Sequence, residues 1–404
     1  MKPTKENILT INAGSSSIKF AVYEIGEMLR PLLHGVMESI GTENTKLIYS
    51  RIQSDKKIST DIKPVSHDEA IVILLDWLEK QDEFASVKII GHRIVHGMHH
   101  TQPQQITPPL LTELKKISAY DPEHLPGEIK LIEELGKRFP ALVQVACFDT
   151  SFHTSMPLVA KMLSIPRRYF DMGIQRYGFH GLSYAYLMEE LNRLGGNTAG
   201  NDKVILAHLG NGASLAAVRD GKCMDTSMGF TPTSGLPMST RSGDLDPGVA
   251  WYLMNAEKIS PQQFSHLIND ESGLLGISAL SSDMRVLLEN QATDHHAAEA
   301  IDMFCYQVKK WIGAYAAVLG GLDTLVFSGG IGERASEIRS RICEGLQFLG
   351  IELDERRNRN NEETISSDKS KVIIHVIKTN EELMIARLVC QVLNISLEYD
   401  PEGP

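Results

Sequence analysis

Charged side chains recur in short loops rich in glycine, proline and phenylalanine. Arg93 lies in the segment GHRIVHG, Asp149 in FDTSFHTSMP, His180 in RYGFHGLS and Arg241 in TRSGDLDP. Guanidinium groups bind carboxylates and phosphates through paired hydrogen bonds, and an imidazole can add one more donor. One such residue alone is more often structural than functional. Several in glycine-flanked loops indicate a site where positive charge converges on a small anion.

A pattern that occurs twice in the chain points to phosphate. Residues 10–22 (TINAGSSSIKFAV) and 206–218 (LAHLGNGASLAAV) share the order of apolar run, turn of small residues and apolar run, with Val22 over Val218 at a constant offset of 196. Each copy predicts two strands joined by a tight turn whose bare backbone N–H groups can approach an anion. Two ordinary hairpins would look the same. With the charged loops, the repeat favours phosphoryl transfer from a polyphosphate held by two related lobes.

A third glycine-rich turn, at 329–332, is followed by a helical pattern over 333–346. Residues 330–335 also fit a dinucleotide-binding fingerprint, with Glu352 and Asp354 at the distance of a ribose contact. That fingerprint is short and common, and here it comes late in the chain. A strand-to-helix turn that faces a nucleotide is therefore favoured over a nicotinamide site, and a plain helix start is the remaining alternative.

Strand-like runs alternate with helical patterns, which predicts an α/β protein. The length of 404 residues favours two domains. The charged stretch 354–370 is predicted to be a solvated surface segment. Strands are expected at 87–90, 143–147, 204–208, 324–327 and 372–377, and helices at 70–80 and 301–319.

Composition excludes several classes of partner. The net charge of −11, from 40 basic and 51 acidic residues, opposes binding to nucleic acid or to an anionic membrane surface. The segment MKPTKEN leads into an apolar run too short for a signal peptide, and no segment approaches the ~20 apolar residues of a membrane span. Five scattered cysteines without a C-x-x-C pair predict buried, reduced thiols. We therefore expect a cytoplasmic protein.

Four histidines, His92, His96, His99 and His100, invite a metal-site interpretation. The glycines at 91 and 97 and the strand expected before them argue against one helix that presents His92 and His96 together. Structural roles are therefore favoured for these histidines.

Ten ordered segments of the chain resemble the acetate and propionate kinases, which belong to the superfamily of sugar kinases, actin and heat-shock chaperones. They span nearly the whole chain: 12–19, 91–97, 148–153, 176–181, 208–214, 225–232, 240–247, 282–285, 330–333 and 379–383. The resemblance implies an α/β fold of two duplicated actin-like (ribonuclease H-like) lobes with an ATP cleft between them, and a homodimer. We place the first lobe at 1–147 plus 383–404, and the second, with the nucleotide-binding loops, at 148–382.

The activity implied by the resemblance is Mg²⁺-dependent, reversible, in-line phosphoryl transfer from ATP to acetate, which gives acetyl phosphate and ADP. Propionate is the alternative acid and butyrate a weaker one, because one methylene in an apolar pocket is worth only ~1–3 kcal/mol. A nucleotide-switched actin-like binding protein is the alternative from a different class. Such a protein would need the hairpins but not Arg93, Arg241 and His180 together.

Transferred residue by residue, the resemblance assigns catalytic roles to Asp149, His180, Arg241 and Arg93. It places Arg93 at the substrate carboxylate and an apolar wall at Val95, Phe179 and Pro232. Asn12 and Glu381 correspond to the Mg²⁺ ligands, where Mn²⁺ could substitute. The ATP/ADP contacts correspond to Ser16, Lys19, His208, Leu209, Gly210, Asn211, Gly212, Asp283, Met284, Arg285, Gly330, Ile331, Gly332, Glu333 and Arg334.

The chemistry accounts for this inventory. A carboxylic acid with a pKa near ~4–5 is ionised at neutral pH and needs no base. The obstacle is repulsion between its carboxylate and the γ-phosphoryl group, so positive charge and alignment are required. On this argument Asp149 orients Arg93 or a metal-bound water rather than donating a proton.

The chain departs from the family pattern at two places that bear on its ligands. The run Glu123-His124-Leu125-Pro126 stands where the family has L-H-N-P, which puts a glutamate at an expected pocket leucine. A buried carboxylate beside a carboxylate substrate is unfavourable. We therefore expect the alignment with the family to shift so that Leu125 fills the apolar wall of the pocket, or else Glu123 to point away from the pocket. Arg334 replaces a usual asparagine and bears on nucleotide preference.

Overall fold

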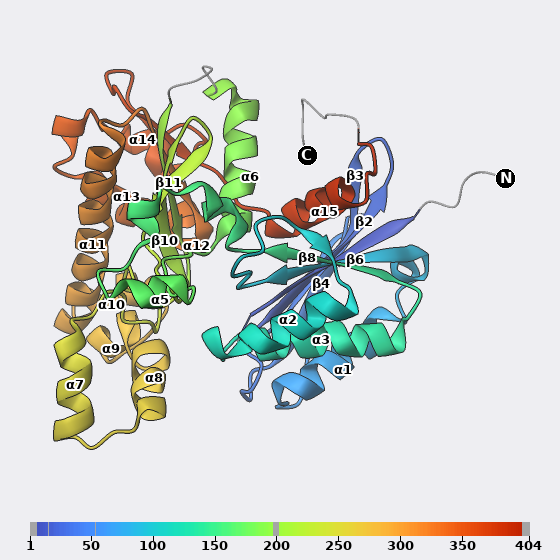
Figure 1. The fold of residues 1–404 in the computed structure, drawn as a ribbon. Helices are drawn as coiled ribbons and strands as arrows, with labels where there is room; N and C mark the ends of the chain where they lie inside the picture. Colours follow the sequence, from blue (N-terminus) through green and yellow to red (C-terminus); the bar gives the residue numbers. More distant parts are fainter. Residues whose placement is uncertain (1–5, 15, 53, 197–201, 398–404) are drawn as a thin grey trace. The chain divides into compact units, whose positions relative to one another are not determined.

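The computed structural model describes residues 6–14, 16–52, 54–196 and 202–397. The chain divides into two compact units, which we call unit 1 (residues 1–151 and 380–404) and unit 2 (residues 152–379) (Figure 1). Asp149 and Glu381 therefore belong to unit 1, whereas the boundaries drawn from the sequence placed both in the second lobe. Ser15, in the first hairpin turn, lies outside the described residues.

Unit 1 is built on a mixed sheet with the strand order β5-β4-β3-β2-β1-β6-β8-β7. The strands from β1 to β5 are antiparallel to their neighbours, whereas β6 and β8 continue from β1 in parallel. Every residue of β1 is buried, as expected for a central strand covered on both faces. The strands are β1 (Asn7–Ala13), β2 (Ile18–Ile25), β3 (Leu29–Glu38), β4 (Lys46–Arg51), β5 (Ser54–Asp61), β6 (Val87–Ile94), β7 (Gln104–Gln105) and β8 (Val143–Phe148).

Helices cover both faces of this sheet (Figure 1). Apolar residues of α1 (His67–Leu78) and α3 (Leu125–Arg138) pack in one core with β1, β2 and β3, and α2 (Pro108–Ile117) packs on α3. On the opposite face α15 (Glu381–Val392) lies against β1, β6 and β8. A Cβ at Gly91 would stand 2.5 Å from Ile385 Cγ2 and 2.7 Å from Val389 Cγ2. This glycine, which precedes Arg93 by two residues, therefore allows α15 to contact β6 directly.

Unit 2 repeats the same strand plan. Its sheet has the order β11-β10-β9-β12-β13, with β9, β10 and β11 antiparallel and with β12 and β13 continuing from β9 in parallel. This matches β3-β2-β1-β6-β8 of unit 1 in order and direction, so the α/β class and the duplication are confirmed. The strands are β9 (Lys203–Leu209), β10 (Ala213–Arg219), β11 (Lys222–Thr226), β12 (Thr324–Ser328) and β13 (Ile373–Val376).

The two hairpin turns differ by one residue. Ala13 pairs with Ile18 across the first hairpin, whereas Leu209 pairs with Ala213 across the second. The first turn therefore comprises residues 14–17 and the second residues 210–212. The constant offset of 196 is thus wrong beyond the turns: by register, Val22 corresponds to Ala217 rather than to Val218.

In unit 2, α6 (Gly181–Leu191) and α11 (His295–Leu319) lie on opposite faces of the sheet (Figure 1). The helix expected over 333–346 is interrupted at Ala335, whose ψ of 80° separates α12 (Gly329–Arg334) from α13 (Ser336–Cys343). The remaining helices of this unit are α4 (Leu158–Lys161), α5 (Arg167–Asp171), α7 (Pro247–Ala256), α8 (Pro261–Asp270), α9 (Gly273–Ser278), α10 (Met284–Asn290) and α14 (Glu355–Arg359).

Most of the charged stretch 354–370 is exposed or half-buried, as its composition predicts, but some of its residues are anchored in the interior of unit 2. Asn358 and Ile365 are completely buried. Asn358 is buried because it supplies acceptors to the guanidinium of Arg339 on α13, which is itself fully buried. The guanidinium donates to Asn358 Oδ1 (2.8 Å), to the Asn358 carbonyl (2.7 Å), to Asn361 Oδ1 (2.7 Å) and to the Gly332 carbonyl (2.8 Å).

All five cysteines lie in the described ranges, where they are buried and unpaired, as predicted. Burial raises the pKa of the Cys147 thiol well above its usual range. Across the described part of the chain, no helix combines the length and the apolar character that a membrane crossing requires.

Candidate active site

In unit 1, the structure brings Arg93 and Asp149 together. Arg93 Nη2 donates to Asp149 Oδ2 at 2.9 Å, and Nη1 donates to the Ala13 carbonyl at 3.2 Å. The two residues meet because β6 and β8 are parallel, so their carboxyl ends share one edge of the sheet. Burial opposes the charge of Arg93, but the carboxylates of Asp149, Glu128 and Glu381 outweigh it and raise the pKa of the guanidinium.

Glu128, in the first turn of α3, is a residue that the sequence analysis missed. Its carboxyl group accepts the Val95 backbone N–H at 3.0 and 3.3 Å, and its Oε1 lies 3.9 Å from Arg93 Nη1. The side chain is 3 % exposed, and burial raises its pKa to about 8, against the opposing effects of Arg93 and of the Val95 amide. A signal existed in the sequence, since Glu128 falls on the apolar stripe that runs through Leu125, Ile132 and Leu135.

The residues assigned to Mg²⁺ also lie together in unit 1. Asn12 Nδ2 donates to Glu381 Oε2 at 2.6 Å and to Glu382 Oε1 at 3.2 Å. Both glutamates occupy the first turn of α15, which packs against β1. Two carboxylates and an amide oxygen are the hard ligands that Mg²⁺ prefers, so this set fits the ion. Glu382 is an additional candidate ligand that the sequence analysis did not name.

Lys19 and Ser16 lie on the first hairpin and are exposed. Lys19 on β2 pairs with Asn12 on β1, so the predicted phosphate and metal residues are neighbours in the sheet. A cavity of about 310 Å³ opens beside this hairpin, with Glu128 in its wall. It is lined by Ala13, Gly14, His67, Asp68, Glu123, His124, Pro126, Gly127, Glu128 and Lys130.

The structure shows where Glu123, which stands in place of the family's pocket leucine, is located. Glu123 is exposed at the edge of this cavity, whereas Leu125 is completely buried as the first residue of α3. Between them, His124 Nδ1 contacts Asp121 Oδ1 at 2.9 Å. The glutamate therefore avoids burial, and Leu125 supplies apolar contact one turn before Glu128.

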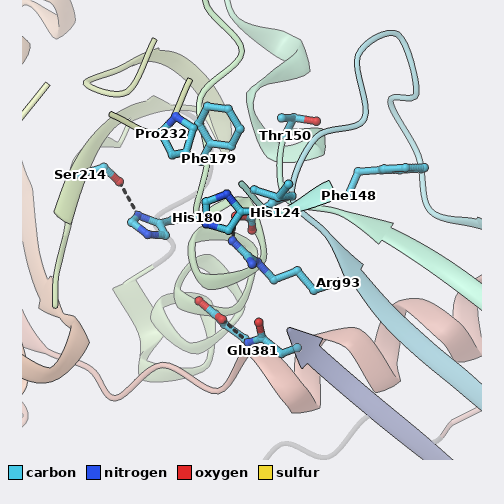
Figure 2. A network of polar contacts seen from close by, with 12 residues as sticks. Arg93, His124, Phe148, Thr150, Phe179, His180, Ser214, Pro232 and Glu381 are labelled. Carbon is cyan, nitrogen blue, oxygen red and sulfur yellow. Dashed lines mark hydrogen bonds and ion pairs between the residues drawn. The ribbon is translucent and has the colours of Figure 1, made fainter. Parts of the chain in front are cut away.

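In unit 2, His180 is held at the second hairpin. Its backbone is left-handed, with φ of 59°, and it stands immediately before α6. Its Nδ1 contacts Ser214 Oγ at 2.8 Å (Figure 2). Ser214 Oγ is also 2.5 Å from the Tyr184 hydroxyl. The ring stacks on His208, with centroids 4.3 Å apart. These contacts fix the plane of the imidazole.

Arg241 approaches the same turn. A Cβ at Gly212 would stand 3.0 Å from His180 Nε2 and 3.8 Å from Arg241 Nη1, so both side chains face the bare backbone of this glycine. Arg241 Nη1 also donates to the Pro232 carbonyl at 3.4 Å. Pro232 and Phe179 are buried in unit 2, and Val95 is buried in unit 1.

The third glycine turn lies against the second hairpin. The Gly330 amide nitrogen is 3.6 Å from the position of a Cβ at Gly210, and Gly329, with φ of +74°, has no room for a Cβ beside the Leu209 backbone. Glu333 Oε1 accepts from the amides of Gly329 (3.1 Å) and Thr379 (3.2 Å). The two predicted nucleotide segments, 208–212 and 330–334, are therefore neighbours in unit 2.

Of the other residues predicted to contact the nucleotide, some have exposed side chains and one is buried. Asp283 caps α10 and pairs with Arg285 at 2.6 Å, Met284 is buried, and Arg285 and Arg334 are exposed. Asp354, once considered for a ribose contact, instead accepts from the Arg356 and Arg357 amides at the start of α14.

Several arginine and histidine residues in or near these loops hold the fold together. Arg176 Nη1 donates to three consecutive carbonyls, those of residues 226–228. His153 Nε2 contacts the Phe179 carbonyl at 2.9 Å, which helps to fix the residue before His180. His92 contacts Gln144 Oε1 at 2.8 Å, and burial lowers its pKa to about 4.

The histidine-rich loop has one arrangement that the sequence analysis did not anticipate. Among the described residues, His99, His100 and Glu113 form the one group of three His, Cys, Asp or Glu side chains close enough together to hold a metal ion. His100 Nε2 lies 3.2 Å from Glu113 Oε2, and the His99 side chain is largely exposed.

Comparison with known proteins places these observations in a family. The sequence model of the acetokinase family matches residues 7–387. An acetate kinase of Methylocella silvestris is 41 % identical over 94 % of this chain and 96 % of its own length, and one of Dictyoglomus thermophilum is 41 % identical over 96 % and 99 %.

Solved structures agree. A propionate kinase of Francisella tularensis is 38 % identical, with a TM-score of 0.88 over 96 % of this chain and all of that one. An acetate kinase of Porphyromonas gingivalis is 35 % identical, with a TM-score of 0.85 over the same shares. The match extends from the first hairpin to α15 and includes the loops that carry Arg93, His180 and Arg241. This chain is a kinase with two actin-like lobes, and it belongs to the acetokinase family.

Proposed function

We propose that this protein is an acetate kinase, which transfers the γ-phosphoryl group of ATP to acetate and forms acetyl phosphate and ADP. The observation that carries the proposal is the approach of His180 and Arg241 to Gly212 in the second glycine hairpin. A binding protein switched by a nucleotide would need the hairpin, but it would not need an arginine and a histidine directed at its turn.

Each group then has a physical task. The acid arrives ionised, so the protein must offset repulsion between two anions rather than remove a proton. Arg93 binds the substrate carboxylate, and Arg241 and His180 stabilise the charge on the transferring phosphoryl group. Mg²⁺, held by Asn12, Glu381 and Glu382, would neutralise phosphate charge when bound.

The test is direct. The full chain is incubated with ATP, Mg²⁺ and acetate, propionate or butyrate, and acyl phosphate is trapped with hydroxylamine. We expect the highest kcat/KM with acetate, a lower value with propionate and the lowest with butyrate. Omission of Mg²⁺, with a chelator present, should abolish the product. ATP binding without trapped product from any acid would instead favour the switched-binding alternative.

Asp149 is assigned to orienting Arg93. Its carboxylate is completely buried and accepts from Arg93 Nη2. Asp149→Asn keeps an acceptor oxygen but removes the charge opposite the guanidinium. We expect kcat/KM for the acid to fall about 10²-fold, because a buried charged hydrogen bond is worth roughly 1.5–3 kcal/mol. A near-normal rate in the same trapping assay would count against any need for charge at this position.

We further propose that the protein is a homodimer. Helix α7 has no buried residue, and it exposes 70 % of Trp251 and 61 % of Tyr252. Large aromatic side chains left exposed on one helix are typical of protein interfaces. Light scattering after size exclusion should give about twice the chain mass of 44.8 kDa, and Trp251→Glu should reduce it to one chain. A wild-type mass of one chain would contradict the proposal.

A further inference from the structure

We propose that Glu128 is a positioning residue of the acid site: its carboxyl group fixes Val95 and Arg93, and it competes with the substrate carboxylate for the Arg93 guanidinium. This inference rests on the proposed function, because it assigns Arg93 to the acid.

The geometry joins three elements at this carboxyl group. Glu128 extends from the first turn of α3 and accepts the amide of Val95, just beyond the end of β6, through both oxygens. Its Oε1 lies 3.9 Å from Nη1 of Arg93, two residues earlier. A single side chain on α3 therefore sets the position of the residue proposed to bind the carboxylate and of one residue in the proposed apolar wall.

The two halves of the Arg93 guanidinium are used differently. Nη2 donates to Asp149 at hydrogen-bond distance. Nη1 donates to the Ala13 carbonyl at 3.2 Å and has Glu128 Oε1 at 3.9 Å, beyond hydrogen-bond distance. The two groups already stand at ion-pair distance, and a small movement of Glu128 or Arg93 would bring them to hydrogen-bond distance. An ionised Glu128 would then occupy the edge of Arg93 that Asp149 leaves to a substrate.

The charge on Glu128 decides whether this competition occurs. Its environment favours the neutral form near neutral pH, with a pKa raised to about 8 mainly by burial. The nearby acids Asp121 and Asp149 add to that rise, and Arg93 and the Val95 amide oppose it. Above pH 8 the carboxylate forms, attracts Arg93 and repels the substrate carboxylate. The cavity beside it adds His67, Asp68, Glu123, His124 and Lys130 as the other ionisable groups that line the space next to Glu128.

The experiment measures KM for acetate, KM for ATP and kcat from pH 6.5 to 9.5 with the full chain. For wild type we expect KM for acetate to rise about tenfold between pH 7.5 and pH 9, while KM for ATP changes less than twofold. Glu128→Gln keeps an oxygen acceptor for Val95 but cannot ionise, so its KM for acetate should stay level over the same range. Glu128→Ala loses the acceptor as well, and its KM for acetate should be at least tenfold higher at every pH.

A matched control is Glu134→Gln on the same helix, which removes a partly exposed carboxylate that pairs with Lys137. It should keep the wild-type pH profile. Circular dichroism and melting curves establish that each variant is folded. An alkaline rise in Glu128→Gln equal to that of wild type would overturn the inference and leave the proposed function standing. A wild-type chain that makes no acyl phosphate at any pH would overturn both.

Discussion

Arg241→Ala is expected to lower kcat for acyl phosphate formation about a thousandfold. Arg241 lies beside the second hairpin turn, where its Nη1 and the His180 ring face Gly212. Removal of one preorganised donor at a site of developing charge costs about 10²–10³ in rate, and loss of an arginine that stabilises phosphoryl transfer costs about 10³–10⁵. Because the interaction strengthens in the transition state, KM for ATP should change much less than kcat.

The matched control is Arg356→Ala, which removes an exposed arginine of the same unit that pairs with Glu362. It should keep kcat within twofold. Arg241→Lys should fall between the two, because a lysine supplies charge without the planar pair of donors. An Arg241→Ala variant that retained a tenth or more of the wild-type kcat in the hydroxylamine assay would remove Arg241 from the catalytic residues.

Arg339→Met is expected to lower the free energy of unfolding of unit 2 by about 3–5 kcal/mol. The methionine fills much of the volume but leaves the four acceptors of the Arg339 guanidinium without their donors. Each buried acceptor without a partner costs roughly 1–3 kcal/mol, and partial relaxation keeps the total below the sum. Burial lowers the pKa of Arg339 to about 10, so the side chain remains charged at neutral pH and its bonds are charge-assisted.

Measuring the stability of unit 2 requires a fluorescence signal that comes from unit 2 alone. Of the three tryptophans, Trp77 belongs to unit 1, whereas Trp251 and Trp311 belong to unit 2. In a Trp77→Phe background, fluorescence during urea unfolding reports unit 2 alone, which avoids treating two units as one transition. Arg341→Met on the same helix, a partly exposed arginine paired with Asp302 and Glu337, should cost less than 1 kcal/mol. Equal midpoints for Arg339→Met and the background protein would contradict the prediction.

The sequence predicts the architecture well because its strongest signals are local. The strands expected at 87–90, 143–147 and 204–208 form as β6, β8 and β9. The duplication is visible in the hairpins because each requires the same small residues at its turn. The turn lengths are less visible, since an ungapped comparison cannot show that one turn is a residue shorter, and only the pairing register reveals it.

Pairs of residues distant in the sequence are harder to predict. For Asp149 the sequence leaves open whether it orients Arg93 or a metal-bound water. The parallel pairing of β6 with β8 brings the two residues to one edge of the sheet, where they form an ion pair. Glu128 was missed because helix periodicity is usually scanned for apolar residues, and a glutamate on the buried stripe does not stand out. Arg339 and Asn358 show the same limit. The composition of 354–370 predicts a solvated segment, and it does not indicate that Asn358 accepts a hydrogen bond from a buried guanidinium on another helix.

Unit 1 is discontinuous in the chain, and this has a consequence for its biosynthesis. Its sheet is complete at Phe148, yet the face of β6 at Gly91 is covered by Ile385 and Val389 of α15. While a ribosome makes the intervening 228 residues of unit 2, from 152 to 379, that apolar face is open to water. Unit 2 is continuous in the chain, so it can fold before α15 has been synthesised. The N-terminal segment of unit 1 is therefore translated first but is the last to gain its full packing, because it must wait for α15.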